Sequence, residues 1–193
     1  GVAIASRQKI EDVTYGLPGD ESDEHARYME ATIDCIRVAT IYLPNGNPAP
    51  GPKFDYKLDW LSRLEARAAK LLESEIPVVL GGDYNVIPDD RDCYDPAGWV
   101  GDALTRPESR AAFRRLIHLG YTDALRSLHP YEVFYTYWDY QAGAWQRDHG
   151  VRIDHFLLSP EALDLLEKVT IDRDPRGLEK PSDHTPILCE LTS

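Results

Sequence analysis

Three short polar clusters, each attached to the end of an apolar run, constrain this chain more than any other feature. They are Gly81-Gly82-Asp83-Tyr84-Asn85-Val86, Arg152-Ile153-Asp154-His155 and Ser182-Asp183-His184-Thr185-Pro186. The adjoining apolar runs, residues 78–80, 156–158 and 187–188, are typical of buried strands. Carboxylates at the ends of buried strands are held rigidly at a surface cleft, as a metal site that cleaves phosphate esters requires. We therefore expect the three clusters to meet around one cleft.

The length and the net charge of the chain limit the number of domains and the kinds of partner that we expect. At 193 residues, the chain is expected to form a single domain over residues 1–193. Its formal net charge of −12 argues against a large nucleic-acid-binding surface, because neutralising phosphates takes Lys and Arg. Clustered carboxylates can instead serve a divalent cation, whose own charge reverses the local field. The acidity is therefore an objection to nucleic-acid binding but does not exclude it.

The cysteines and the ends of the chain bear on its location. Cys35, Cys93 and Cys189 are odd in number, widely spaced and without metal-ligand spacing, which favours a reducing, cytoplasmic compartment. No apolar stretch approaches the roughly 20 residues that span a bilayer, so no membrane partner is expected. Residues 1–7 have the composition of a strand already under way. We therefore expect a fragment, or a chain that starts inside a longer one.

The pattern of apolar residues predicts a mixed α/β sandwich. Strands are expected at residues 33–43, 76–80, 151–158, 169–172 and 186–191, and helices at 54–73, 109–119 and 160–167. Residues 11–30 are polar and contain glycine and proline, which predicts a loop, and the aromatic segment 133–145 predicts an irregular hairpin. Helices and strands alternate, but not as regular βαβ units, so a doubly wound sheet fits less well.

Asp83 and Asn85 form the first candidate pair. The preceding glycine pair would let the backbone turn sharply after a buried strand. Asp83 would then bind a metal or take a proton from water, and Asn85 would donate to a phosphate oxygen without adding charge. The alternative is a plain turn in which both side chains satisfy local backbone groups.

The other two clusters also allow two interpretations. His184, oriented by the neighbouring Asp183, would act as a general base or would stabilise phosphate charge. A turn with a surface histidine explains the same residues. Asp154 would face the cleft near a leaving group, or would form only a weak surface pair with Arg152.

Tyr42, Asn45 and the aromatic segment are further candidates. A phenol at the end of a strand can donate to a phosphate, and Asn45 can present its amide to one. A half-buried strand tyrosine followed by a plain turn explains both equally well. The aromatic residues 134–140, including Trp138, can stack on bases or a sugar, or can pack a core.

Five motifs in order resemble the exonuclease III family of apurinic/apyrimidinic endonucleases. That family belongs to the endonuclease/exonuclease/phosphatase superfamily, to which deoxyribonuclease I is related. The motifs cover nearly the whole chain and are residues 41–46, 82–86, 136–140, 150–154 and 182–186. The resemblance implies two packed mixed β-sheets flanked by helices, a four-layer α/β sandwich of the deoxyribonuclease I type. It also implies a DNA repair phosphodiesterase acting on duplex DNA.

The resemblance implies roles for individual residues. Asp83 would orient or deprotonate the attacking water, Asn85 would bind the scissile phosphate, and His184, held by Asp183, would stabilise the developing charge. Asp154 would support the metal site or the leaving group. The implied ligands of Mg²⁺ or Mn²⁺ are Asp83, Asn85 and Asp183. The implied substrate contacts are Tyr42, Asn45, Asn85, Trp138 and Arg152, with Trp138 near the pocket for an extruded abasic sugar.

Two family positions have no counterpart in this sequence. The family carries an Asn in its first strand and, further on, a Glu that is its main metal ligand, both upstream of the strand matching Val2 to Ser6. The resemblance therefore implies a domain without its first strand-helix segment, with one sheet short and metal binding weakened. The expected partner is duplex DNA with abasic sites or 3′ ends, bound by a monomer. The alternatives are a phosphatase acting on a lipid or small phosphoester, and a catalytically impaired DNA-binding remnant.

Overall fold

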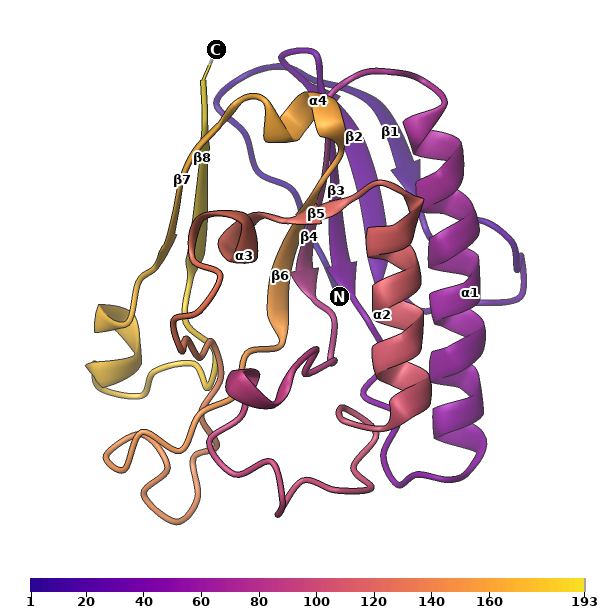
Figure 1. The fold of residues 1–193 in the computed structure, drawn as a ribbon. Helices are drawn as coiled ribbons and strands as arrows, with labels where there is room; N and C mark the ends of the chain where they lie inside the picture. Colours follow the sequence, from indigo (N-terminus) through magenta and orange to yellow (C-terminus); the bar gives the residue numbers. More distant parts are fainter. Residues whose placement is uncertain (193) are drawn as a thin grey trace.

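The computed structural model describes residues 1–192 and is built on a six-stranded mixed sheet (Figure 1). Its strands lie in the order β1 (Ile10–Tyr15), β2 (Tyr28–Ile33), β3 (Ile36–Tyr42), β4 (Val78–Asp83), β6 (Asp154–Leu158) and β5 (Thr122–Asp123). Only the central β3–β4 pair is parallel. A separate antiparallel pair, β7 (Leu166–Ile171) and β8 (Ile187–Leu191), forms a small second sheet.

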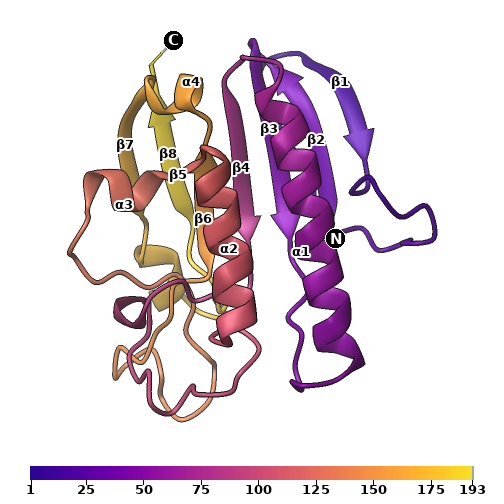
Figure 2. The same cartoon turned by 45° about the vertical axis from the view of Figure 1, so that its right-hand side comes forward.

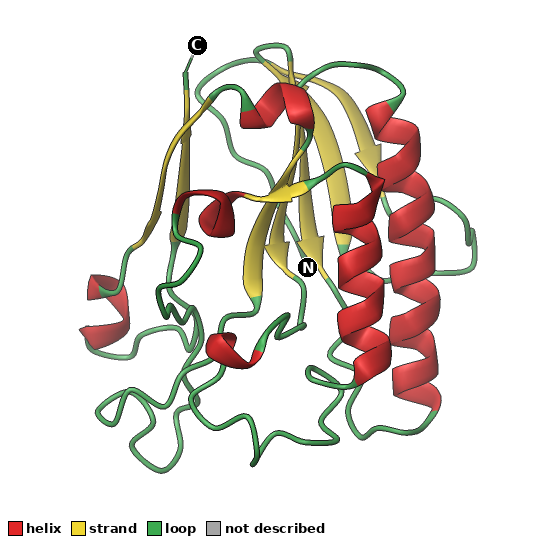
Figure 3. Ribbon diagram, viewed as in Figure 1, coloured by secondary structure: helices red, strands yellow, loops and turns green. Residues whose placement is uncertain are grey.

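Two long helices, α1 (Pro52–Leu72) and α2 (Pro107–Leu119), lie side by side over one face of the large sheet (Figures 2 and 3). Both begin with a proline, whose missing N–H costs nothing in the first turn of a helix. Trp60, Leu64 and Ala68 recur at helical spacing on the buried side of α1. Among the helices of residues 1–192, none is long and apolar enough to cross a membrane.

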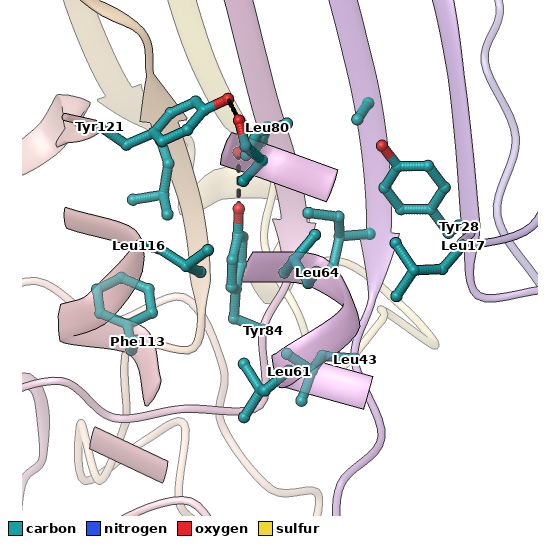
Figure 4. Close-up of a cluster of buried hydrophobic side chains, with 14 of the residues drawn as sticks. Leu17, Tyr28, Leu43, Leu61, Leu64, Leu80, Tyr84, Phe113, Leu116 and Tyr121 are labelled. Atoms are coloured by element: carbon teal, nitrogen blue, oxygen red, sulfur yellow. Dashed lines mark hydrogen bonds between the residues drawn. The ribbon is translucent and has the colours of Figure 1, made fainter. Parts of the chain in front are cut away.

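The main core lies between these helices and the large sheet (Figure 4). Leu64 of α1 and Leu116 of α2 pack against Leu80 of β4, and the Tyr84 ring lies among them, fully buried. The Tyr84 hydroxyl donates to the Leu80 carbonyl at 3.0 Å, so its polar end is satisfied. This packing fixes the strand end that precedes Asn85.

A second core joins the two sheets. Val79 of β4 and Leu158 of β6 are buried with Val169 of β7, and the half-buried inner residues of β8 pack on them. Two short helices, α3 (Ala124–Leu128) and α4 (Pro160–Leu163), contribute Leu125 and Ala162 to this cluster. The prediction of two packed sheets flanked by helices is confirmed. In the described residues the layers are the α1–α2 pair, the large sheet and the small sheet.

The sequence reading is wrong at three segments. The loop expected at 11–30 contains most of β1 and the start of β2. In β2 the alternation of apolar and polar residues is interrupted, because Glu30 is buried in ion pairs with Arg37 and Arg67. Residues 2–6, expected as a strand, lie outside the strands. The helix expected at 160–167 ends at Leu163, and β7 begins at Leu166. Segment 133–145 is irregular as expected, and its Tyr137 makes only isolated bridges.

Candidate active site

Strand register brings three of the candidate side chains to one end of the large sheet. Tyr42 at the end of β3 is the register partner of Asp83 at the end of β4. Asp83 is in turn the register partner of Asp154, which begins β6. Partners in register on neighbouring strands point to the same face of a sheet. The three residues therefore lie in a row across the ends of β3, β4 and β6.

The glycine pair before Asp83 allows close packing within β4. A Cβ on Gly81 would lie 2.6 Å from the Phe156 ring. Gly82 has φ +140, and a Cβ there would lie 2.1 Å from the Ile41 carbonyl oxygen. Both glycines lie inside the strand, so the expected sharp turn at the glycine pair is wrong. The chain turns after Asp83 instead.

Asn85 is locked by hydrogen bonds on both ends of its amide. Its Nδ2 donates to Asp83 Oδ2 at 2.8 Å and to the Leu43 carbonyl at 2.9 Å, while its Oδ1 accepts from Asn45 Nδ2 at 3.1 Å. Its backbone N–H donates to Asp83 Oδ1 at 2.8 Å. These bonds connect Asp83, Asn85 and Asn45 into one network with fixed geometry. The plain-turn interpretation explains the local bonds to Asp83 but not the link to Asn45, forty positions away.

The partner of His184 is Asp154. His184 Nδ1 lies 2.9 Å from Asp154 Oδ2 and 3.1 Å from Oδ1. The expectation that Asp183 holds His184 is wrong, because the carboxylate within hydrogen-bond distance of the imidazole is that of Asp154. The interpretation of Asp154 as a surface partner of Arg152 is also wrong, because Asp154 bonds His184 while the buried Arg152 bonds Asp92 and Asp123.

The electrostatics of the pair suit charge stabilisation and proton transfer. Burial lowers the pKa of His184, but the hydrogen bond and charge of Asp154 outweigh this and raise it to about 9. Burial raises the pKa of Asp83 well above its ordinary value, and the charge of Asp154 adds to the effect. At neutral pH the imidazole is therefore positively charged beside a carboxyl group that takes up a proton easily.

These residues surround a cleft of about 290 Å³. It is lined by the expected residues Tyr42, Asn45, Asp83, Asn85, Asp183 and His184, and also by Asn47, Trp99, Asp102, Leu104, Tyr137 and Ile153. Trp99 and Asp102 were missed, because they lie in a loop whose Pro, Asp and Gly residues signal only a turn. Asn47 Nδ2 donates to Asp102 Oδ2 at 3.0 Å, which ties that loop to the one after β3.

Two expected substrate contacts lie elsewhere. Trp138 is fully buried, and its indole N–H donates to Asp148 at 3.0 Å. Its neighbour Tyr137 lines the cleft instead, because adjacent residues of an extended segment face opposite ways. Arg152 is also buried and bonds Asp92 at 2.7 Å and Asp123 at 2.8 Å. Both residues are therefore part of the interior, and their assignment as substrate contacts is wrong.

A buried lysine below the cleft was also missed. Lys57 of α1 is fully buried, and its Nζ donates to the backbone carbonyls of Asn45, Asn85 and Ala103. Burial lowers its pKa to about 7, and the carboxylates of Asp102 and Asp83 oppose that shift. The helical period of residues 54–73 puts Lys57 on the same face as Leu61 and Leu64. The sequence alone still predicts an exposed side chain there, because lysine is rarely buried.

The residues present fit part of a site for a hard divalent cation. Asp83, Asn85 and Asp183 present oxygen ligands at the cleft. Within residues 1–192, no three Asp, Glu, His or Cys side chains gather as a complete metal centre. Mg²⁺ is commonly held by one or two carboxylates, with water and substrate phosphates completing its shell. The raised pKa of Asp83 also marks an excess of buried negative charge that a cation would neutralise.

Comparison with known proteins gives consistent matches. Residues 1–184 match the Endonuclease/Exonuclease/phosphatase family. An exodeoxyribonuclease of Bacillus subtilis is 32% identical over 188 residues, which cover 97% of this chain and 72% of that protein. The structure of a Neisseria 3′ phosphatase bound to a product DNA hairpin has a TM-score of 0.94 and 39% identity, covering 97% of this chain and 73% of that one. The structure of an AP endonuclease from Archaeoglobus fulgidus has a TM-score of 0.91 and 34% sequence identity, covering 96% of this chain and 72% of that one.

Proposed function

The chain belongs to the endonuclease/exonuclease/phosphatase family, and from this premise we propose that it is a DNA repair phosphodiesterase of the exonuclease III type. It cleaves duplex DNA on the 5′ side of abasic sites and removes 3′-terminal nucleotides or blocking groups. The observation that carries the proposal is the convergence of Asp83, Asn85 and the His184–Asp154 pair on one cleft. The family's members are metal-dependent nucleases, and Mg²⁺ or Mn²⁺ is the cofactor we propose.

Asp83 orients the attacking water and accepts its proton. Its carboxylate is anchored by the backbone and side-chain amide of Asn85, one bond to each oxygen, and both oxygens can still accept a further hydrogen bond. A raised pKa makes it a stronger base than an ordinary aspartate, closer to the working pH. Water activated there can attack a phosphate group placed in the cleft beside Asn85.

His184 stabilises the charge that grows on the phosphoryl oxygens. With its pKa raised to about 9 it is an imidazolium at neutral pH. Because Asp154 occupies Nδ1, the free Nε2–H is the donor available to the phosphate. A fixed cation aimed at developing charge in a partly buried site is worth far more than the same charge in water.

The remaining lining residues position the substrate. Tyr42 and Asn45 offer a phenol and an amide at the strand end nearest the phosphate position. Leu104, Ile153 and Trp99 form an apolar wall, against which a flipped sugar without a base can pack. When bound by Asp83, Asn85 and Asp183, Mg²⁺ supplies charge neutralisation at the phosphate.

A duplex carrying a tetrahydrofuran abasic mimic tests the proposal. We expect a nick on the 5′ side of the mimic with Mg²⁺ and none with excess EDTA, while an intact duplex of the same sequence is left uncut. The matched variant Asp83→Asn should be inactive under the same conditions. A protein that leaves the abasic strand whole at high Mg²⁺ and enzyme excess contradicts the assignment.

Release of phosphate from a 3′ end is the second candidate. It is favoured by the Neisseria relative, which is named a 3′ phosphatase. Comparing a 3′-phosphate hairpin with a phosphoinositide and the abasic duplex separates this activity from a lipid phosphatase and from endonuclease action. The monomeric state, the single domain and the cytoplasmic location stay predictions.

A further inference from the structure

The buried Lys57 gathers three loops at one point beneath the catalytic cleft. An ammonium group is costly to bury unless its N–H groups are all bonded. Lys57 Nζ donates to the carbonyls of Asn45 at 3.0 Å, Asn85 at 2.6 Å and Ala103 at 3.2 Å. Three acceptors match the three N–H groups of the protonated side chain. The carbonyls come from the loops after β3, after β4 and before α2.

Two of these carbonyls belong to residues whose side chains face the substrate. Asn45 and Asn85 both line the cleft and are bonded to each other. Asn85 has φ +47, a left-handed conformation that non-glycine residues adopt only when the surroundings hold them there. The shortest of the three Lys57 bonds goes to the Asn85 carbonyl. Lys57 is therefore one of the groups that hold this backbone in place.

Close packing of the lysine stem adds a second restraint. A Cβ on Gly46 would lie 2.7 Å from Lys57 Cδ, and Gly46 has φ +90. The loop that carries Asn45 is thus fitted directly onto the methylene groups of Lys57. Lys57 does not line the cleft, so it acts on the substrate through the loops that it holds and through the charge that it presents to Asp83.

We propose that Lys57 is a positioning residue, which holds Asn45 and Asn85 in the geometry that binds the scissile phosphate. This inference rests on the phosphodiesterase function proposed above. Loss of the ammonium would free the Asn85 carbonyl and let the bonded Asn45–Asn85 pair shift within the cleft. A displacement of about 1 Å at such a position costs about 100-fold in rate.

The test compares Lys57→Met with Lys70→Met, the same change on an exposed residue at the far end of α1. On the abasic duplex with Mg²⁺ we expect kcat of Lys57→Met to fall about 100-fold, with KM changed by less than about threefold. Lys70→Met should match the wild type. Lys57→Gln, which keeps one donor group, should recover part of kcat. A kcat for Lys57→Met within about twofold of the wild type overturns the proposal.

An NMR comparison tests the same idea without catalysis. At pH 6 the wild type should show a slowly exchanging ammonium signal from Lys57, and Lys57→Met should shift and broaden the side-chain amide signals of Asn45 and Asn85. Unchanged amide signals overturn the inference. If Lys57→Met does not fold, the absence of that ammonium signal in the wild type overturns it equally. A wild type inactive on the abasic duplex refutes the proposed function alone, and the NMR result still decides the role of Lys57.

Discussion

His184 Nδ1 lies 2.9 Å from Asp154 Oδ2, across the junction of the two sheets. Asp154 begins β6 of the large sheet, while His184 lies just before β8 of the small one. Tyr137 bridges to His184 on one side and to Val151 on the other, so the segment before β8 is joined to the segment that leads into β6. The docking of the sheets therefore sets the position of the imidazole.

Replacing Asp154 by Asn should lower the pKa of His184 from about 9 toward 6.5. The hydrogen bond and charge of Asp154 are what raise it, whereas Asp183 is a weaker contributor. NMR titration of the histidine ring signals measures the shift. Asp183→Asn is the control and should leave the pKa well above 6.5. A value near 9 in Asp154→Asn would show that another group holds the imidazolium.

Asp83→Asn should abolish most activity while making the fold no less stable. Removal of the base should lower kcat by about 10²–10⁴-fold. Because burial raises the pKa of Asp83, its ionised form opposes folding, so the Asn variant should melt at the same or a higher temperature at pH 8. Calorimetry in EDTA at pH 8 and pH 5 checks this, and the difference should shrink at pH 5. A clearly lower Tm at pH 8 would contradict the assignment.

Arg152→Met should destabilise the protein strongly. It leaves Asp92 and Asp123 as buried carboxylates without their central cation, at a cost of about 3–5 kcal/mol. Urea denaturation measures the loss. Arg115→Met, which breaks the more exposed pair with Glu65, is the control and should change stability by about 0.5 kcal/mol or less. Equal effects of the two changes would rule out a buried network.

Stability should fall as the pH drops from about 6.5 to about 4, because of His155. Burial and the charge of Arg152 lower the pKa of this histidine to about 4. Arg152 donates to Nδ1 and Nε2 faces the Val86 carbonyl, which fixes the neutral ring. The unfolded chain takes up the proton first, so about 3 kcal/mol is lost across this window. Urea titrations at several pH values should show a flatter slope for His155→Gln and an unchanged slope for His118→Gln, on the exposed side of α2.

The central elements of the fold follow from the sequence. The helical period of residues 54–73 predicts α1 to within two residues at its start, and the apolar runs beside Asp83 and Asp154 predict β4 and β6. The first strands could not be predicted in the same way, because β1 lies at an exposed sheet edge and β2 buries Glu30. An ion pair that makes a charged residue internal is visible only once Arg37 and Arg67 are placed.

The membership of the site was predicted better than its contacts. Asp83, Asn85, Tyr42, Asn45, Asp183 and His184 do line one cleft. Which carboxylate faces His184 depends on how the two sheets pack together. Which of Tyr137 and Trp138 faces the cleft depends on the register of that segment, where a shift of one residue exchanges the two side chains. The local sequence pattern determines neither. Lys57 escaped notice because its partners are backbone carbonyls, which carry no sequence signal.

The two-sheet origin of the imidazole–carboxylate pair has a consequence for when activity appears. A partly synthesised or partly opened chain, in which the small sheet has not yet docked, holds its aspartates but lacks the histidine beside them. We therefore expect phosphodiesterase activity to require the docked small sheet, because only then does His184 lie beside Asp154.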